Sequence, residues 1–132
     1  MDALRAKIAE LAEEHELHGC FECGKCNAIC PLYDLFEDFD WKGSPRSIVE
    51  AGLDERDLTA GDAIWYCLQC DACTEGCPCG VEIRDFIADV RSLALEAGLD
   101  EHVRRCTSCG DPFAPLTTLE AIARCTAEQG DP

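Results

Sequence analysis

Cys67-Leu-Gln-Cys70-Asp-Ala-Cys73-Thr-Glu-Gly-Cys77-Pro78 is a run in which four cysteines and a proline follow the spacing C-x2-C-x2-C-x3-C-P. The same spacing occurs 47 positions earlier in the chain, at Cys20, Cys23, Cys26, Cys30 and Pro31. A register that holds over five positions indicates that one binding unit is duplicated. We therefore expect the rest of the chain to be organised around these two runs.

The spacing suits a [4Fe–4S] cluster. Cysteines separated by two residues let three thiolates of one tight, partly helical turn reach three iron corners of the same cube. In the bacterial two-cluster arrangement, the cysteine before the proline binds the cluster of the other run. We therefore expect cluster A to be bound by Cys20, Cys23, Cys26 and Cys77, and cluster B by Cys67, Cys70, Cys73 and Cys30.

Two other classes of site also use many cysteines. Twelve cysteines in 132 residues suit a secreted disulfide scaffold, but Met1 is followed by charged Asp2, Arg5 and Lys7 rather than by an apolar export signal. A structural zinc site needs only two C-x2-C pairs, so it leaves the third cysteine and the Cys-Pro pair of each run unexplained. The iron–sulfur interpretation is favoured.

The charge balance restricts the partners of the chain. Eleven basic and 27 acidic residues give a net charge of −16, which argues against binding to nucleic acid or to an anionic membrane surface. No apolar stretch is long enough to insert directly into a membrane. Cysteines that are not used in disulfides indicate a reducing, cytoplasmic location, and two cubane clusters favour one that is poor in oxygen.

The N-terminal residues have an amphipathic pattern. Leu4, Ile8 and Leu11 recur at helical spacing, which predicts a helix over residues 2–17. We interpret residues 1–18 as an N-terminal docking helix. His15 and His18 are predicted to be surface residues rather than metal ligands, because eight thiolates already complete two cubane clusters.

Helix signals also follow the two runs. Ser44 and Pro45 predict the start of a short helix over residues 45–51, with Gly52 as its end. The apolar spacing predicts a longer helix over residues 81–97. The segments Glu50-Ala-Gly-Leu-Asp-Glu55 and Glu96-Ala-Gly-Leu-Asp-Glu101 are identical at an offset of 46, so the duplication continues beyond the ligands.

With these runs, helices and the block Ala63-Ile-Trp-Tyr-Cys67 before the second run, the chain resembles the C subunit of heterodisulfide reductases. It is also similar to the helical dicluster ferredoxin domains of related anaerobic oxidoreductases. The resemblance covers about residues 18–97 and implies a mainly α fold. It implies an α-helical ferredoxin-like dicluster domain over residues 19–99, carrying two [4Fe–4S] clusters.

The resemblance also implies a function. Proteins of this kind are electron-relay subunits of larger soluble oxidoreductase complexes, where they pass single electrons between a flavin or cluster subunit and a catalytic partner. The chain itself is expected to be non-catalytic, since it has no adjacent Cys-Cys pair and no glycine-rich nucleotide-binding motif. The alternatives are a free ferredoxin-type carrier and an iron–sulfur subunit of a hydrogenase-linked or formate-linked complex.

Residues 100–132 depart from this resemblance. Cys106-Thr-Ser-Cys109-Gly110 has the pattern of a metal knuckle, and a helix predicted from the capping box Thr117…Glu120 runs to Cys125. We expect a third metal site here, of zinc or iron–sulfur type, bound by Cys106, Cys109 and Cys125. Its fourth ligand is left open between His102, Cys79, another chain and residues beyond Pro132.

The two runs differ in local charge. Lys25 offsets Glu22 in the first run, whereas the second run contains Asp71 and Glu75 with no basic residue. An added electron is less unfavourable where the surrounding charge is less negative. The charges within the runs therefore predict that cluster A is the easier of the two to reduce.

Overall fold

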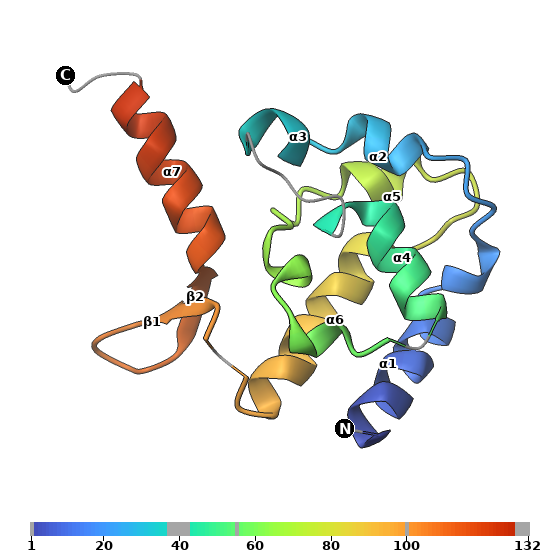
Figure 1. Cartoon of the computed structure of the whole chain (residues 1–132), viewed down its shortest axis with the longest axis horizontal. Helices are drawn as coiled ribbons and strands as arrows, with labels where there is room; N and C mark the ends of the chain where they lie inside the picture. Colours follow the sequence, from blue (N-terminus) through green and yellow to red (C-terminus); the bar gives the residue numbers. More distant parts are fainter. Residues whose placement is uncertain (1, 37–42, 55, 100, 129–132) are drawn as a thin grey trace.

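The structure, a computed structural model, describes residues 2–36, 43–54, 56–99 and 101–128. It is mainly helical, as predicted from the sequence (Figure 1). The α-helices are α1 (Asp2–Glu14), α2 (Lys25–Ile29), α3 (Leu32–Leu35), α4 (Pro45–Leu53), α5 (Ala72–Gly76), α6 (Ile83–Glu96) and α7 (Leu116–Glu128). Short 3-10 helices are η1 (Leu17–Gly19), η3 (Leu58–Ala60) and η4 (Ala63–Trp65), and the strands are β1 (Val103–Arg105) and β2 (Pro112–Pro115). Within these described segments, no helix has both the length and the apolar character needed to cross a bilayer.

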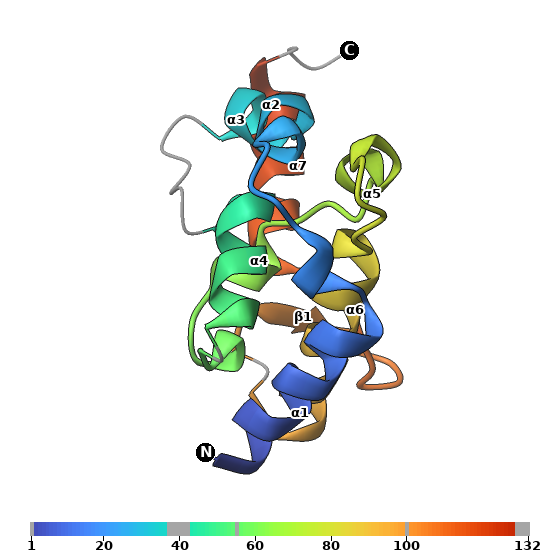
Figure 2. The same cartoon turned by 90° about the vertical axis from the view of Figure 1, so that its right-hand side faces the viewer.

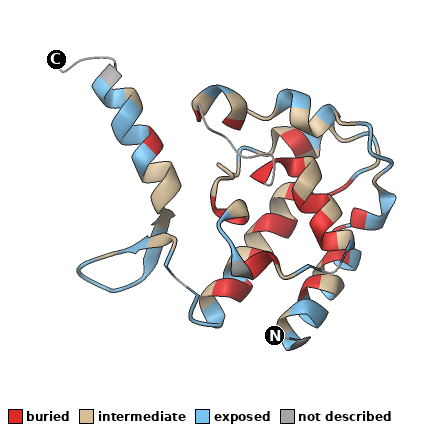
Figure 3. Cartoon of the chain, viewed as in Figure 1, coloured by how far each residue is buried: buried red, intermediate tan, exposed pale blue. Residues whose placement is uncertain are grey.

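Helix α6 is the centre of the main core. It packs against α1 and α5 (Figure 2) and against η3 and η4. Burial along it recurs at helical spacing (Figure 3). Its buried residues are Ile83, Phe86, Ile87, Val90, Leu93 and Ala94. Burying each large apolar side chain of this kind contributes about 1.5–3 kcal/mol. The helix predicted over residues 81–97 is confirmed with slightly narrower bounds, Ile83–Glu96, and Gly98, at φ 82°, follows its end.

Helix α1 packs inside the chain. It contacts α4 and α6, and its residues Ile8 and Ala12 are buried against that core. The helix is shorter than the predicted residues 2–17, because the chain turns after Glu14 and Glu16 adopts a φ of 64°. The prediction that His15 lies on the surface is wrong, since only 7% of this residue is exposed.

Helix α4 begins as predicted but ends later. The Ser44 hydroxyl accepts a hydrogen bond from the backbone N–H of Ser47 at 3.2 Å, so Ser44 is the N-cap. Gly52 does not end the helix and is buried inside it. A Cβ atom at Gly52 would lie 2.7 Å from Cδ2 of Leu17 and 3.0 Å from Cζ of Phe86. Glycine is needed here because the α4 backbone approaches η1 and α6 closely.

The C-terminal residues 101–128, here called the tail, form a hairpin and α7. Helix α7 runs beside α3 (Figure 1). Strands β1 and β2 pair antiparallel, with Val103 opposite Pro115. Helix α7 starts at Leu116, so the predicted N-cap at Thr117 is wrong. The Thr117 hydroxyl instead donates to the carbonyl oxygen of Trp65 at 2.6 Å. Ala121 of α7 is buried in a second small core with Leu32 and Phe36 of the α3 segment.

Candidate metal centre

The two cysteine runs have the same backbone conformation. Helix α5 repeats α2 at the offset of 47, and a residue in the left-handed region precedes each helix: Gly24 at φ 77° and Asp71 at φ 71°. Two positions earlier, Glu22 and Gln69 also adopt positive φ, at 61° and 60°. This conformation costs a non-glycine residue about 1–3 kcal/mol, so its repetition indicates that the turn geometry is required at both places.

The same turns direct backbone donors at sulfur. The N–H of Glu22 donates to Sγ of Cys20 at 3.4 Å, and the N–H of Gln69 donates to Sγ of Cys67 at 3.3 Å. The side-chain amide of Gln69 adds a second donor to Cys67 Sγ at 3.5 Å. Hydrogen bonds to ligand sulfurs are one of the means by which proteins tune iron–sulfur potentials.

One cavity brings together cysteines from both runs. The four cysteines that line it are Cys30, Cys67, Cys70 and Cys73. These are the residues expected to bind cluster B, and Cys30 reaches the cavity from the opposite run, because α2 packs against α5. Much of the rest of the lining is apolar, and includes buried Leu32 and Ile87.

The thiols of the first run also lie near one another. Burial raises the pKa of Cys26, and the charges of Cys20 and Cys23 raise it further. The pKa of Cys79 is raised by burial and then by the charges of Cys77, Cys23 and Cys20. Cys79 therefore lies beside the cysteines expected to bind cluster A and not beside the tail in which it was a candidate ligand.

Two of the thiols in the cavity, those of Cys73 and Cys30, are poor acids without a metal. Burial raises the pKa of Cys73 to about 12. The pKa of Cys30 is also raised, first by burial and then by the neighbouring charges of Cys67 and Cys70. Because metals bind the thiolate form, a cluster would supply the positive charge that holds these sulfurs deprotonated.

Arg91 lies next to Cys67 of this group and has no acidic partner among the residues that the structure describes. Its Nη2 donates to the carbonyl oxygen of Cys67 at 2.6 Å, and its Nε donates to that of Ile64 at 2.8 Å. The guanidinium also lies 5.4 Å from the centre of the Trp65 ring. Burial lowers the pKa of Arg91, while the charge of Cys67 opposes that shift.

A partly buried cation without a counter-ion is unfavourable. No carboxylate in the described segments of the chain lies within 4.0 Å of Arg91. A [4Fe–4S] cluster with four thiolate ligands is anionic. The cavity of four cysteines, its apolar walls and the adjacent arginine therefore fit an iron–sulfur cluster.

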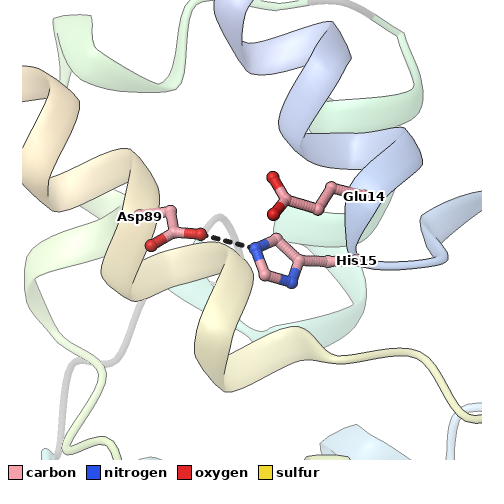
Figure 4. A group of neighbouring side chains, drawn as sticks. All are labelled: Glu14, His15 and Asp89. Atoms are coloured by element: carbon pink, nitrogen blue, oxygen red, sulfur yellow. Dashed lines mark hydrogen bonds and ion pairs between the residues drawn. The ribbon is translucent and has the colours of Figure 1, made fainter.

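A second polar group lies between α1 and α6. Figure 4 shows His15 with Glu14 and Asp89: Nε2 of His15 lies 2.6 Å from Oδ2 of Asp89. On the other side of the ring, Nδ1 lies 2.9 Å from Oε1 of Glu82. Burial lowers the pKa of His15, but the hydrogen bonds and charges of Glu82 and Asp89 outweigh it, so the pKa is raised. The ring links α1 to α6, since each of its nitrogens faces a carboxylate of the α6 segment.

The tail repeats part of the turn of the two runs, although Ser108, at the position of Glu22 and Gln69, does not adopt a positive φ. The N–H of Ser108 donates to Sγ of Cys106 at 3.4 Å, and Gly110, after the second cysteine, has a φ of 80°. The backbone N–H groups of Cys109 and Ser108 lower the pKa of Cys106. Cys106 and Cys109 lie in the loop between β1 and β2, where Cys109 is exposed.

The structure does not gather the remaining predicted tail ligands at this loop. His102 stacks against Trp65, with their ring centres 6.4 Å apart, and Cys125 lies on α7. In the described segments, the groups of three or more potential ligand atoms within 4.8 Å of one another all contain His15. None of those groups includes Cys106, Cys109 or Cys125.

Sequence reasoning missed Arg91 and the role of His15. Arg91 lies 24 positions from Cys67 and fits the helical pattern of α6 as an ordinary polar residue. His15 gave one usable signal: it follows Ile8 and Leu11 on the apolar side of the predicted helix. That spacing favours a buried position over an exposed one.

Comparisons with known proteins agree with the geometry. The family described as "4Fe-4S dicluster domain" matches residues 16–81, which contain both runs and make up half of the chain. The chain is 32% identical over 83 residues to the C subunit of the ferredoxin:CoB-CoM heterodisulfide reductase of Methanosarcina mazei. That alignment covers 61% of this chain and 49% of the relative.

Two shorter alignments involve other relatives. The chain is 43% identical over 47 residues to the second iron-sulfur C subunit of the CoB–CoM heterodisulfide reductase of Methanocaldococcus jannaschii, covering 36% of this chain and 24% of that protein. It is 39% identical over 46 residues to the nitrogen fixation protein FixG of Rhizobium meliloti, covering 35% of this chain and 8% of that protein. The matches thus span about half or less of each relative.

Proposed function

Because this chain belongs to the family of 4Fe-4S dicluster domains, we propose that it is the electron-relay subunit of a larger oxidoreductase of the heterodisulfide reductase type. It is an iron–sulfur electron-transfer protein with two [4Fe–4S] clusters, related to the C subunit of heterodisulfide reductases. In the proposed complex it passes single electrons between a flavin or cluster subunit and a catalytic partner in the cytoplasm. The cavity shared by Cys30 and the second run carries this proposal.

The proposed ligands follow the crossed pattern. Cys20, Cys23, Cys26 and Cys77 bind cluster A, and Cys67, Cys70, Cys73 and Cys30 bind cluster B. Bound clusters supply one-electron redox chemistry. The protein's own part is to hold the thiolates, to donate N–H groups to Cys20 and Cys67, and to limit the access of water. Buried Leu32 and Ile87 line the cavity of the second run and keep it apolar.

Affinity purification of the tagged full chain from its native anaerobic cells tests complex membership. A relay subunit elutes from size-exclusion chromatography well above its own mass of 14.4 kDa and brings a flavin or iron–sulfur subunit with it. Brown colour and about eight iron atoms per chain report the clusters themselves. Elution near the monomer mass with intact clusters would favour the free carrier instead.

We also propose that the hairpin loop forms a third metal site through Cys106 and Cys109. Support comes from the turn itself, which has the N–H to sulfur bond and one of the two positive-φ positions of the cluster turns. Two thiolates complete only half of a tetrahedral site. Cys125 becomes the third ligand if α7 shifts from its contact with α3; otherwise a second chain or further residues supply the rest.

A further inference from the structure

We infer that Arg91 is the counter-ion of cluster B and that it raises the reduction potential of cluster B above that of cluster A. This inference rests on the proposed function and adds the direction in which electrons move between the two clusters. The sequence comparison of the two runs predicts the opposite order, because it counts only charges within each run. The structure brings charges to the runs from α4 and α6.

The arginines beside each run that form ion pairs are balanced. Arg46 of α4 lies 3.8 Å from Glu22 of the first run and 3.2 Å from Glu50. Arg84 of α6 lies 3.7 Å from Asp71 of the second run and 3.3 Å from Asp85. Each guanidinium faces two carboxylates, so neither arginine gives its run a net positive charge. Within the runs, Lys25 and Glu75 still favour cluster A, and Arg91 has to outweigh them.

Arg91 breaks this balance. It has no carboxylate within 4.0 Å in the described part of the chain. Its guanidinium donates a hydrogen bond to the carbonyl oxygen of Cys67, a proposed ligand of cluster B. Reduction makes an anionic cluster more negative. A cation held at this position stabilises the reduced form more than the oxidised form, and its effect is strengthened where water is excluded.

Burial alone acts in the opposite direction. Enclosure of an anionic cluster disfavours the added negative charge, and the second run is the more enclosed, with buried Cys73. Arg91 is itself partly buried, so the exclusion of water also reduces the screening of its charge. The second N–H donor to Cys67 Sγ, from the Gln69 side chain, adds to the same effect.

The resulting order gives the relay a direction. Each run has one exposed cysteine, Cys23 or Cys70, but the first run is the more accessible, because 63% of Phe21 is exposed whereas Cys73 of the second run is buried. The second run is covered by α6 on one side and by the small core of α3 and α7 on the other. Electrons that enter at the accessible run then move towards the more favourable cluster B.

A redox titration followed by electron paramagnetic resonance tests this on the full chain with both clusters. The Cys73→Ser variant identifies cluster B, because an oxygen ligand changes the signal of that cluster alone. In the wild type we expect cluster B to be reduced at the higher potential. Arg91→Met should shift the potential of cluster B to a more negative value and leave that of cluster A unchanged. Arg91→Lys keeps the positive charge, so its cluster B should have a potential close to the wild-type value.

A second variant keeps Arg91 but balances its positive charge with a new carboxylate. Leu95 lies four positions along α6 and lines the same pocket as Arg91, so Leu95→Glu places a carboxylate beside the guanidinium. We expect the same negative shift for cluster B, with Leu95→Gln as the matched control without a shift. This variant decides the matter if Arg91→Met fails to fold.

Three results overturn the inference. One is a wild-type chain in which cluster B is reduced at the lower potential. Another is a chain with intact clusters in which neither Arg91→Met nor Leu95→Glu moves the potential of cluster B. Either leaves the proposed relay standing, since both clusters still take up electrons reversibly. The third, a chain that binds no reducible cluster, overturns the relay as well.

Discussion

Nε2 of His15 lies 2.6 Å from Oδ2 of Asp89, so a residue at the end of α1 is fixed to the middle of α6. Nδ1 of the same ring lies 2.9 Å from Glu82. With a carboxylate at each nitrogen, the ring is most stable as a cation. The backbone joins the same two segments, since the N–H of Glu82 donates to the carbonyl of His15 at 3.0 Å.

Replacing this histidine should loosen α1. The carboxylate partners are about half exposed, with 46% of the side chain accessible for each pair, so solvent weakens the ion pairs. We expect His15→Gln to lower the free energy of unfolding by about 1–2 kcal/mol. Anaerobic urea unfolding of the cluster-loaded chain measures it. His18→Gln, at an exposed position, is the control, and an equal loss there would contradict a specific role for His15.

The stabilisation by His15 should depend on pH. The pKa of His15 in the folded chain is raised above its usual value of 6.5. The stabilisation is therefore complete below pH 6.5 and is lost as the pH rises through the raised value. The carboxylates that face the ring are those of Glu14, Glu82, Asp85 and Asp89. Melting temperatures of the wild type and His15→Gln should converge with rising pH, and a constant gap would contradict this.

Gly52 should not accept a side chain. Its Cβ position lies 2.7 Å from Cδ2 of Leu17, so Gly52→Ala forces α4 away from η1 or moves Leu17 out of the core. Overpacking of this kind costs about 1–3 kcal/mol. Gly61→Ala is the matched control, because nothing lies within 4 Å of its Cβ position. Thermal unfolding of both variants compares them, and equal stability would show that the contact at Gly52 relaxes without cost.

Crossed ligation predicts which cluster each variant loses. Cys30 lines the cavity of the second run, so Cys30→Ala should remove cluster B, leave cluster A, and lower the iron content from about eight to about four atoms per chain. Cys79→Ala, which removes a neighbouring cysteine that is not a proposed ligand, should keep all of the iron. Iron analysis with resonance spectroscopy measures both, and loss of cluster A in Cys30→Ala would show ligation within each run.

The hairpin loop should bind metal independently of the clusters. We expect Cys106→Ser and Cys109→Ser to lose one metal ion, most simply zinc, while the iron content stays unchanged. Cys125→Ser reports whether α7 supplies the third ligand. Metal analysis of the three variants distinguishes the cases, and a wild-type chain with about eight iron atoms and no other metal would rule out the tail site.

The cysteine runs were predictable because their chemistry is local. Cysteines separated by two residues can reach one metal centre from a single turn, whatever the rest of the fold. The predicted helix over residues 81–97 likewise follows from its own apolar pattern. Arg91 was not predictable, since its contact to Cys67 depends on how α6 lies across the second run. Local rules assign Gly52 to the end of a helix, whereas the neighbours that require a glycine there, Leu17 and Phe86, come from other elements.

The shared backbone of α2 and α5 has a consequence for symmetry. A single half, paired with a copy of itself about a two-fold axis, would present the same eight thiolates in the same crossed pattern. In such a pair the clusters would be equivalent, and an electron would have no preferred side. At the offset of 46 that aligns the two identical hexapeptides, Arg91 corresponds to Pro45. When both halves belong to one chain, an arginine such as Arg91 can lie beside the second run alone. The two clusters then differ, and electron transfer between them has a preferred direction.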